Sequence, residues 1–201
     1  GYAADVCGFK FISHPCKFIY FEVAKTGTGS LLNLLTEHAS ITRMDERLGF
    51  LEYPEYLRFA FVRNPWDRIL SCYLSKIKKD KSFENENFEN GVMRKFQRFN
   101  VFYAGMPFDE FLRAVAKIPD ETADGHFSSQ YTRLVLDGEV IITHLARFDN
   151  YRDEVRKFLD MIGLDSKTKL PHINKSRNRK AYPEYYNDET IRIVEQRYKE
   201  D

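Results

Sequence analysis

One segment near the start of the chain constrains its fold more than any other. Residues 17–23, K-F-I-Y-F-E-V, have the apolar character of a buried strand, and residues 30–38, S-L-L-N-L-L-T-E-H, form a mostly apolar helix. The loop between them holds two glycines, Gly27 and Gly29, with Lys25 at its mouth. Such a loop places backbone N–H groups at a helix N-terminus, where they favour a bound anion. The segment predicts an α/β unit with a phosphate-like ligand at this loop.

The loop differs from the nucleotide loop of P-loop nucleoside triphosphatases. Their pattern is G-x-x-x-x-G-K-[ST], in which the lysine follows the last glycine. Here Lys25 precedes both glycines, so the expected ligand is not the γ-phosphate of ATP. A P-loop kinase or related phosphotransferase remains an alternative, although no acidic residue is clearly placed for Mg²⁺. A nucleotide-binding module without catalysis is the other alternative.

The rest of the chain alternates between strand and helix patterns, which is typical of an α/β fold with a mainly parallel sheet. A single domain is expected over residues 1–201, with residues 80–106 as a possible lid or insertion. Ligands of such sheets bind at the carboxyl ends of the strands, here loops 24–29 and 63–66. The further predicted strands are 57–62 and 140–145, and the further predicted helices are 66–79, 89–99, 108–117, 150–162 and 188–199.

Composition excludes several classes of protein. Hydrophobic residues make up 43% of the chain and charged residues 30%, which is typical of a globular protein. A net charge of +1 gives no support for binding nucleic acid through bulk charge. The chain has no run of about 18 apolar residues, so no membrane span is expected. Three cysteines, Cys7, Cys16 and Cys72, do not make a disulfide framework or a zinc site; Cys7 and Cys16 can pair, but free thiols are the simpler expectation.

A second candidate anion site follows the strand 57–62. Arg63 stands at the carboxyl end of that strand, and Ser71 falls in the second turn of the next helix. A guanidinium fork and a hydroxyl suit a separate phosphate. Two anion sites describe a nucleotide with phosphates on both its 5′ and 3′ sides.

These two motifs resemble those of the sulfotransferases that use 3′-phosphoadenosine-5′-phosphosulfate. Residues 24–30, A-K-T-G-T-G-S, are similar to the 5′-phosphosulfate loop, and residues 63–73, R-N-P-W-D-R-I-L-S-C-Y, to the 3′-phosphate motif. Residues 124–130, D-G-H-F-S-S-Q, and 146–151, A-R-F-D-N-Y, resemble segments of the Golgi-type carbohydrate sulfotransferases and their bacterial relatives, with Asp149 in place of the usual Glu. Further matches to their C-terminal pattern are Asn174-Lys175-Ser176, Tyr185-Tyr186 and residues 198–201.

The resemblance implies a P-loop-like three-layer fold, a central mainly parallel sheet flanked by helices, and transfer of a sulfuryl group to a hydroxyl without a metal. It implies that Lys25 stabilises charge on the leaving 5′-phosphate. It further implies that Arg63 and Ser71 hold the 3′-phosphate. The loop residues expected at the 5′-phosphate are Lys25, Thr26, Gly27, Thr28, Gly29 and Ser30. The segment Asn174, Lys175 and Ser176 is expected to contact the donor, whose product is adenosine 3′,5′-bisphosphate.

Transfer also needs a base for the acceptor hydroxyl, and histidine is the usual choice near neutral pH. His126 is the favoured base because it follows Asp124 by two residues and opens an expected helix that contains Gln130. His144 falls in a strand pattern and is expected in the core. The other residues that stay open or less favoured are Glu22, Glu46, Glu52, His14, His38 and His172.

The resemblance favours a carbohydrate or other hydroxyl acceptor. Phe83, Phe88, Phe99, Phe102 and Tyr103 can stack on sugar rings, although core or lid packing is the simpler expectation. Lys76, Lys78, Lys79 and Lys81 can attract an anionic acceptor or can form a solvated helix end. The sequence predicts a soluble protein, cytoplasmic if bacterial and otherwise the luminal catalytic domain of a Golgi enzyme.

Overall fold

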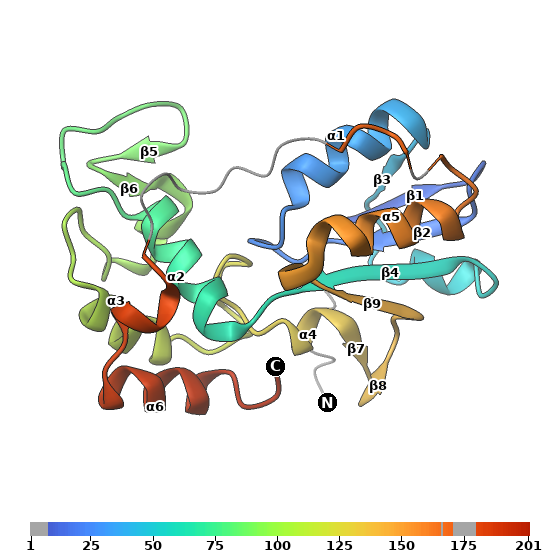
Figure 1. Ribbon diagram of the computed structural model, residues 1–201. Coiled ribbons are helices and arrows are strands. Elements are labelled where there is room, and N and C mark those ends of the chain that lie inside the picture. The colour runs from blue at the N-terminus through green and yellow to red at the C-terminus, as the bar shows by residue number, and fades with distance from the viewer. Residues whose placement is uncertain (1–7, 166, 171–179) are drawn as a thin grey trace. The chain divides into compact units, whose positions relative to one another are not determined.

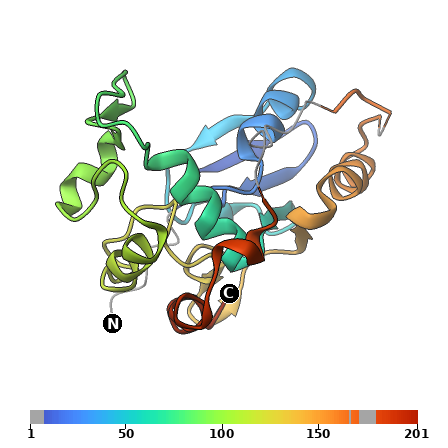
Figure 2. The ribbon, with the colours of Figure 1, turned by 60° about the vertical axis from the view of Figure 1, so that its left-hand side comes forward.

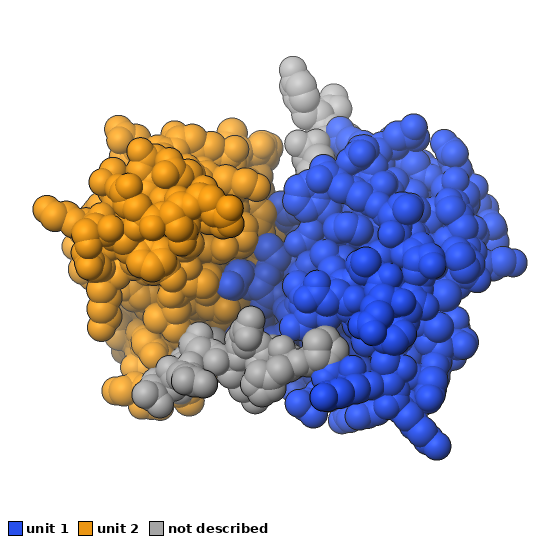
Figure 3. Space-filling model, turned by 90° about the horizontal axis from the view of Figure 1, so that it is seen from above, with its two compact units in different colours: residues 1–64, 130–177 blue, residues 65–129, 178–201 orange. Residues whose placement is uncertain are grey.

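The computed structural model describes residues 8–165, 167–170 and 180–201 of the chain. The chain divides into two compact units, which Figure 3 colours separately. Unit 1 comprises residues 1–64 and 130–177, and unit 2 comprises residues 65–129 and 178–201. The single domain expected over residues 1–201 stays a prediction.

Unit 1 contains a five-stranded sheet (Figure 1). Its strands are, in spatial order, β3 (Thr42–Met44), β1 (Lys10–Ser13), β2 (Phe18–Phe21), β4 (Leu57–Val62) and β9 (His144–Arg147). Strands β2, β4 and β9 run parallel, whereas β1 pairs antiparallel with both β2 and β3. The α/β class is confirmed, but the sheet is mixed rather than mainly parallel. The reason is a tight turn at residues 14–17, in which Lys17 has a φ of 51° and reverses the chain between β1 and β2.

One face of this sheet carries the two long helices of unit 1, α1 (Thr28–His38) and α5 (Tyr151–Met161). The rings of Phe59 on β4 and Phe158 on α5 stack with centroids 3.9 Å apart. Alternate residues of a strand point to one face, and leucines at three- and four-residue spacing line one side of a helix. Both patterns meet in one buried core: Phe18, Tyr20, Leu31, Leu34, Leu35, Phe61, Val155 and Leu159.

The opposite face is covered by shorter elements. These are the 3₁₀ turn η1 (Gly49–Glu52), the helix α4 (Tyr131–Leu134) and the hairpin β7 (Val135–Leu136) and β8 (Glu139–Val140). Phe50, Leu134 and Ile141 pack here against the remaining side chains of β2 and β4. The strand predicted over 140–145 is wrong in position, because β8 ends at Val140 and β9 begins only at His144. The P-loop-like three-layer description stays a prediction.

Unit 2 is built around α2 (Pro65–Lys76), α3 (Phe108–Ala116) and α6 (Asp188–Arg197). These helices contact one another, and Figure 2 shows α3 and α6 side by side. The 3₁₀ turn η4 (Tyr182–Tyr185) precedes α6. The helices predicted over 66–79, 108–117, 150–162 and 188–199 agree with α2, α3, α5 and α6 except for a few terminal residues.

The helix predicted over 89–99 is wrong. The structure has a hairpin, β5 (Phe88–Glu89) and β6 (Val92–Met93), followed by the 3₁₀ helix η2 (Arg94–Phe99). Asn90 and Gly91 form its turn with φ values of 49° and 74°. An Asn-Gly pair at positive φ is the preferred two-residue hairpin turn. The local turn signal thus outweighs the helical spacing.

The aromatic side chains of residues 80–106 have different environments. Phe102 is buried in the core of unit 2, and Phe88 and Phe99 pack against that core. Phe83 and Tyr103 are exposed. Core packing is therefore confirmed for the first three, while sugar stacking stays a prediction for the exposed pair.

Candidate active site

The loop that joins β2 to α1 has an unusual backbone. Lys25 and Gly27 are both left-handed, with φ values of 75° and 80°. Left-handed residues alternating with right-handed ones turn successive N–H groups toward one side and form an anion-binding concavity. Gly27 is the N-cap of α1 and has no side chain to cap the first N–H groups of this helix. These backbone features suit an anion, and anion binding by residues 25–30 stays a prediction.

The hydroxyls of Thr26 and Thr28 both form hydrogen bonds with the backbone of Val23, just before the loop. Thr26 is fully buried, and its Oγ1 donates to Val23 O at 2.7 Å. Thr28 Oγ1 also donates to Val23 O at 3.2 Å, and it lies 3.2 Å from the hydroxyl of Tyr20. Because the Thr28 proton is engaged with Val23 O, Tyr20 is the donor in the second contact, and burial raises its pKa. We therefore expect Thr26 to contact a phosphate through its backbone N–H rather than its hydroxyl.

Two aromatic residues support the loop from the start of α5. A Cβ on Gly27 would lie 2.8 Å from Tyr151 Cε2 and 3.0 Å from Phe148 Cε2, and Tyr151 Oη donates to Gly27 O at 3.3 Å. Phe148 and Tyr151 belong to the segment 146–151, to which sequence reasoning assigned no role. In the structure, Phe148 and Tyr151 of this segment pack against Gly27 and so support the loop.

The close packing of Tyr151 and Phe148 on Gly27 predicts a large loss of stability for Gly27→Ala. A left-handed alanine costs about 1–2 kcal/mol, and forcing its Cβ against Tyr151 adds about 1–3 kcal/mol. We expect urea denaturation to show a free energy of unfolding lower by about 2–5 kcal/mol. The matched control is Gly138→Ala, because Gly138 has a φ of 82° but nothing within 4 Å of the added Cβ. An equal loss of unfolding free energy in both variants would show that Phe148 and Tyr151 do not constrain Gly27.

Arg63 lies beside this loop within unit 1. It directly follows the last residue of β4, and its Nη1 donates to Lys25 O at 2.8 Å. Its guanidinium carbon lies 4.5 Å from the centroid of the Phe148 ring, a cation–π distance. Unit 1 therefore brings together the residues predicted for the 5′-phosphate and the arginine predicted for the 3′-phosphate.

The remaining predicted donor contacts fall elsewhere. Ser71 lies in the second turn of α2 as expected, partly exposed, and belongs to unit 2. Asn174, Lys175, Ser176 and His172 lie outside the described residues, as does Cys7. Donor contacts by Asn174, Lys175 and Ser176, and free thiols at Cys7 and Cys16, stay predictions.

His126 pairs with Asp124 inside unit 2. Asp124 Oδ1 lies 2.6 Å from His126 Nδ1 and also accepts the backbone N–H of His126 at 3.0 Å. Burial alone would raise the pKa of Asp124, but these hydrogen bonds outweigh it and hold the value at about 2. An ionised carboxylate only accepts hydrogen bonds, so Nδ1 carries the proton of the pair. In the neutral imidazole, Nε2 is then the nitrogen that can take a proton.

The helix expected to open at His126 is wrong. His126 lies in a turn in which Phe127 and Ser128 donate their N–H groups to Asp124 O, both at 2.9 Å. Helix α4 begins only at Tyr131. Aspartate favours such turns because its side chain bonds nearby N–H groups in competition with a helix. The same bonding makes Asp124 the orienting partner of His126, a role that the D-x-H spacing could have indicated.

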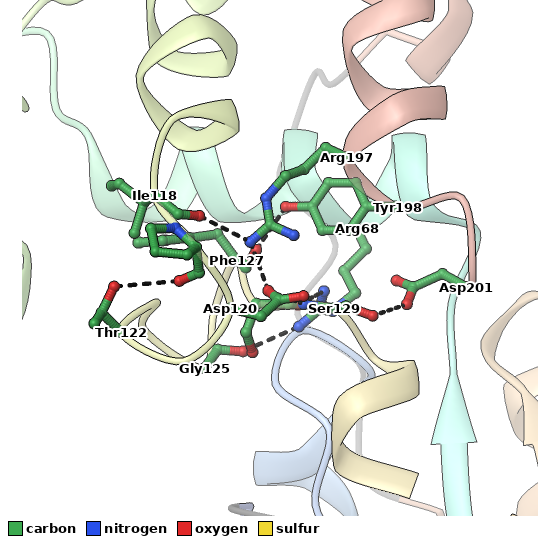
Figure 4. A network of polar contacts seen from close by, with 12 residues as sticks. Arg68, Ile118, Asp120, Thr122, Gly125, Phe127, Ser129, Arg197, Tyr198 and Asp201 are labelled. Carbon is green, nitrogen blue, oxygen red and sulfur yellow. Dashed lines mark hydrogen bonds and ion pairs between the residues drawn. The ribbon is translucent and has the colours of Figure 1, made fainter. Parts of the chain in front are cut away.

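Several long side chains fix the turn that carries this pair (Figure 4). Arg68 is buried, and it donates to Ser128 O at 2.8 Å and to Gly125 O at 3.0 Å. Tyr198 Oη donates to Phe127 O at 2.6 Å. Further bonds join the same segments: Arg197 to Asp120 at 2.5 Å and Ser129 to Asp201 at 2.5 Å. The C-terminal residues 197–201 thus stabilise the backbone around His126.

The other candidate bases have different surroundings. His14 Nδ1 lies 3.0 Å from Tyr56 Oη, and His38 is exposed at the end of α1. His144 is only partly buried, with its ring stacked at 5.6 Å on Phe59. Glu22 is partly exposed, and Glu46 and Glu52 are exposed. None of these placements tests the choice of base, which stays a prediction.

The four lysines near the end of α2 also differ. Lys76 is partly buried, and burial lowers its pKa. Lys78 Nζ lies 4.8 Å from the Phe88 ring centroid, while Lys79 and Lys81 are exposed. Their attraction for an anionic acceptor stays a prediction.

The described part of the chain shows neither a metal-binding cluster nor a helix that could span a membrane. Residues 8–165, 167–170 and 180–201 contain no cluster of three or more His, Cys, Asp or Glu side chains able to hold a metal ion. Within the same ranges, every helix is too short or too polar to cross a membrane. The expectation of metal-free chemistry stays a prediction.

Comparison with known proteins gives distant relatives. An uncharacterized protein from Archaeoglobus fulgidus is 27% identical over 118 residues, which cover 59% of this chain and 77% of that protein. Human carbohydrate sulfotransferase 10 is 24% identical over 132 residues, which cover 59% of this chain and 36% of the human protein. Carbohydrate sulfotransferase 10 from Gallus gallus matches with the same identity and coverage. The match thus spans about a third of the length of these named relatives, and no solved structure matches significantly.

A family model gives the broadest match. The model described as the sulfotransferase family covers residues 10–201, which include the Lys25 loop, Arg63 and the Asp124–His126 turn. Motifs at these three places, together with those at 146–151 and in the C-terminal part of the chain, predict the same relationship. The extent of the match therefore confirms that the chain belongs to the sulfotransferase family.

Proposed function

We propose that this protein transfers a sulfuryl group from 3′-phosphoadenosine-5′-phosphosulfate to a hydroxyl of a carbohydrate. Family membership makes the protein a transferase of sulfuryl groups in general. The observation that supports the specific donor is the hydrogen bond from Arg63 Nη1 to Lys25 O. It places Arg63 beside the Lys25 loop within unit 1, which supports a nucleotide with separate 5′ and 3′ phosphates. The name of the relative carbohydrate sulfotransferase 10 supports a saccharide acceptor.

In this proposal, unit 1 holds the donor. The backbone N–H groups of residues 27–30 bind the 5′-phosphate, and Arg63 binds the 3′-phosphate. The ammonium group of Lys25 stabilises the negative charge that develops on the 5′-phosphate as its bond to sulfur breaks. Fixed cations and N–H groups act strongly on such charge because they need no reorganisation during the reaction.

In this proposal, the Asp124–His126 pair removes the hydroxyl proton of the acceptor. Nε2 of His126 accepts the hydroxyl proton of the acceptor while the acceptor oxygen forms its bond to sulfur. Asp124 keeps the proton of His126 on Nδ1 and stabilises the imidazolium that results, as an orienting carboxylate does in other histidine-based sites. The proton thus ends on His126, and the electron pair of the broken bond ends on the 5′-phosphate oxygen.

The P-loop kinase is not favoured. Lys25 precedes Gly27 in the loop, and its backbone is left-handed there. The lysine that reaches the β- and γ-phosphates in P-loop enzymes instead follows the last glycine and begins the helix. A transfer assay distinguishes the proposed enzyme from a nucleotide-binding module without catalysis.

The test is a transfer assay with donor labelled in its sulfuryl group. The protein is incubated with this donor and a panel of neutral and uronic-acid-containing saccharides, with no metal added. We expect label in at least one saccharide and an equal amount of adenosine 3′,5′-bisphosphate. A protein that binds the donor but labels no acceptor would be a binding module instead. Transfer from ATP in place of the sulfuryl donor would contradict the proposal.

A further inference from the structure

Gln130 makes a paired contact with the backbone of Arg63. Arg63 N–H donates to Gln130 Oε1 at 2.9 Å, and Gln130 Nε2 donates to Arg63 O at 2.9 Å. Only one orientation of the amide satisfies both bonds, since the backbone N–H must donate and the carbonyl must accept. Gln130 is 2% exposed, so little water is available to replace it.

The contact begins where the sheet ends. The last registered pair of β4 and β9 is Val62 with Arg147, one residue before Arg63. The amide of Gln130 pairs with the next residue in the way that a neighbouring strand would. An unpaired backbone group buried in a protein is costly, so this contact fixes the peptide groups on both sides of the Arg63 Cα.

The side chain of Arg63 is held as well. Its Nη1 donates to Lys25 O, and its guanidinium lies over the Phe148 ring. A guanidinium binds a phosphate best through two parallel N–H bonds, which require a defined orientation of its plane. Gln130 fixes the starting point of this side chain, while Lys25 O and Phe148 restrict its far end.

We propose that Gln130 is a positioning residue that makes the site selective for a nucleotide with a 3′-phosphate over the 5′-monophosphate. This inference rests on the proposed function, because it assumes that Arg63 binds the 3′-phosphate. It assigns to Gln130 no contact with the ligand. Its effect passes through the backbone of Arg63 and therefore concerns only the 3′ end of the nucleotide.

The experiment compares two ligands by calorimetry. Adenosine 3′,5′-bisphosphate and adenosine 5′-monophosphate are titrated into wild type and into Gln130→Met, which keeps the volume but removes both hydrogen bonds. The wild type should bind the bisphosphate more tightly. We expect Gln130→Met to reduce that preference by about tenfold or more, the size of one lost charge-assisted contact, with monophosphate affinity nearly unchanged.

Thr143 offers a matched control, because its side chain makes a similar paired contact with the backbone of Arg58 on β4. Thr143 Oγ1 accepts the backbone N–H of Arg58 at 2.8 Å and donates to Arg58 O at 3.1 Å. Thr143→Val removes a similar side-chain clamp from β4, at a distance in sequence from Arg63. We expect it to leave the ratio of the two affinities unchanged.

A double variant separates positioning from general stability. In Arg63→Ala, the bisphosphate preference should already be lost, and adding Gln130→Met should change it no further. Should Gln130→Met fail to fold, Gln130→Glu keeps the bond from Arg63 N–H, loses the bond to Arg63 O, and should lower the same ratio. An unchanged ratio in a folded Gln130 variant, with a normal wild-type preference, would overturn this inference alone. A wild type that shows no bisphosphate preference would instead contradict the proposed function.

Discussion

Replacing Lys25 with alanine should remove nearly all sulfuryl transfer while the protein stays folded. Lys25 supplies the positive charge next to the bond that breaks, and no other residue is proposed for this role. Loss of one fixed group that stabilises transition-state charge lowers turnover by about 10²–10³-fold. Turnover is measured with saturating labelled donor, and folding is measured by urea denaturation.

A second lysine provides the control for this prediction. Lys17 also has a left-handed backbone, with a φ of 51°, but it lies in the turn between β1 and β2. Lys17→Ala therefore removes the same side chain from the same backbone conformation in unit 1. We expect it to keep wild-type turnover. Full activity in Lys25→Ala would remove the role assigned to this lysine.

Replacing His126 with alanine should lower turnover by about 10²–10⁴-fold, the usual contribution of a general base. Affinity for adenosine 3′,5′-bisphosphate should hardly change, because His126 is proposed to act on the acceptor. The control is His38→Ala, which removes an exposed histidine at the end of α1. Wild-type turnover in His126→Ala would move the base elsewhere, with Glu22, Glu46 and Glu52 as the next variants.

Asp124 extends this prediction to pH dependence. Its pKa of about 2 means that the carboxylate stays ionised throughout the neutral and mildly acidic range. A fall in turnover between neutral pH and about pH 5 therefore does not report protonation of Asp124. We expect Asp124→Asn to lower turnover, because the amide N–H can donate to Nδ1 and so stabilise the tautomer of His126 that carries its proton on Nε2. An unchanged rate and pH profile in Asp124→Asn would contradict its orienting role.

The sequence predicted the elements with strong local patterns. The strand around β2, the loop with Gly27, β4 and α2 all follow from apolar runs, glycines and helical spacing within one short segment. Strand β3 was missed because its three residues are stabilised by pairing with β1, which is distant in sequence. Strand β1 was missed as well, although only the turn at residues 14–17 separates it from β2. The hairpin at Asn90-Gly91 carried a local signal that the helical spacing obscured.

The candidate site also contains some residues that the sequence could predict and others that it could not. Lys25, Arg63 and His126 could be proposed from motifs because their side chains carry the chemistry. The supporting residues Tyr151 and Gln130 could not, since each acts by contact with the backbone of a distant residue. Tyr151 supports Gly27 across 124 positions, and Gln130 holds Arg63 across 67. Only the folded chain shows such pairs.

Calorimetry with adenosine 3′,5′-bisphosphate is the most direct test of the central claim, which is that the Lys25 loop and Arg63 form a site for a doubly phosphorylated adenosine. The titration is made without Mg²⁺, and a parallel titration uses ATP with Mg²⁺. We predict tight binding of the bisphosphate that does not depend on Mg²⁺. Mg²⁺-dependent binding of ATP with no binding of the bisphosphate would contradict the account.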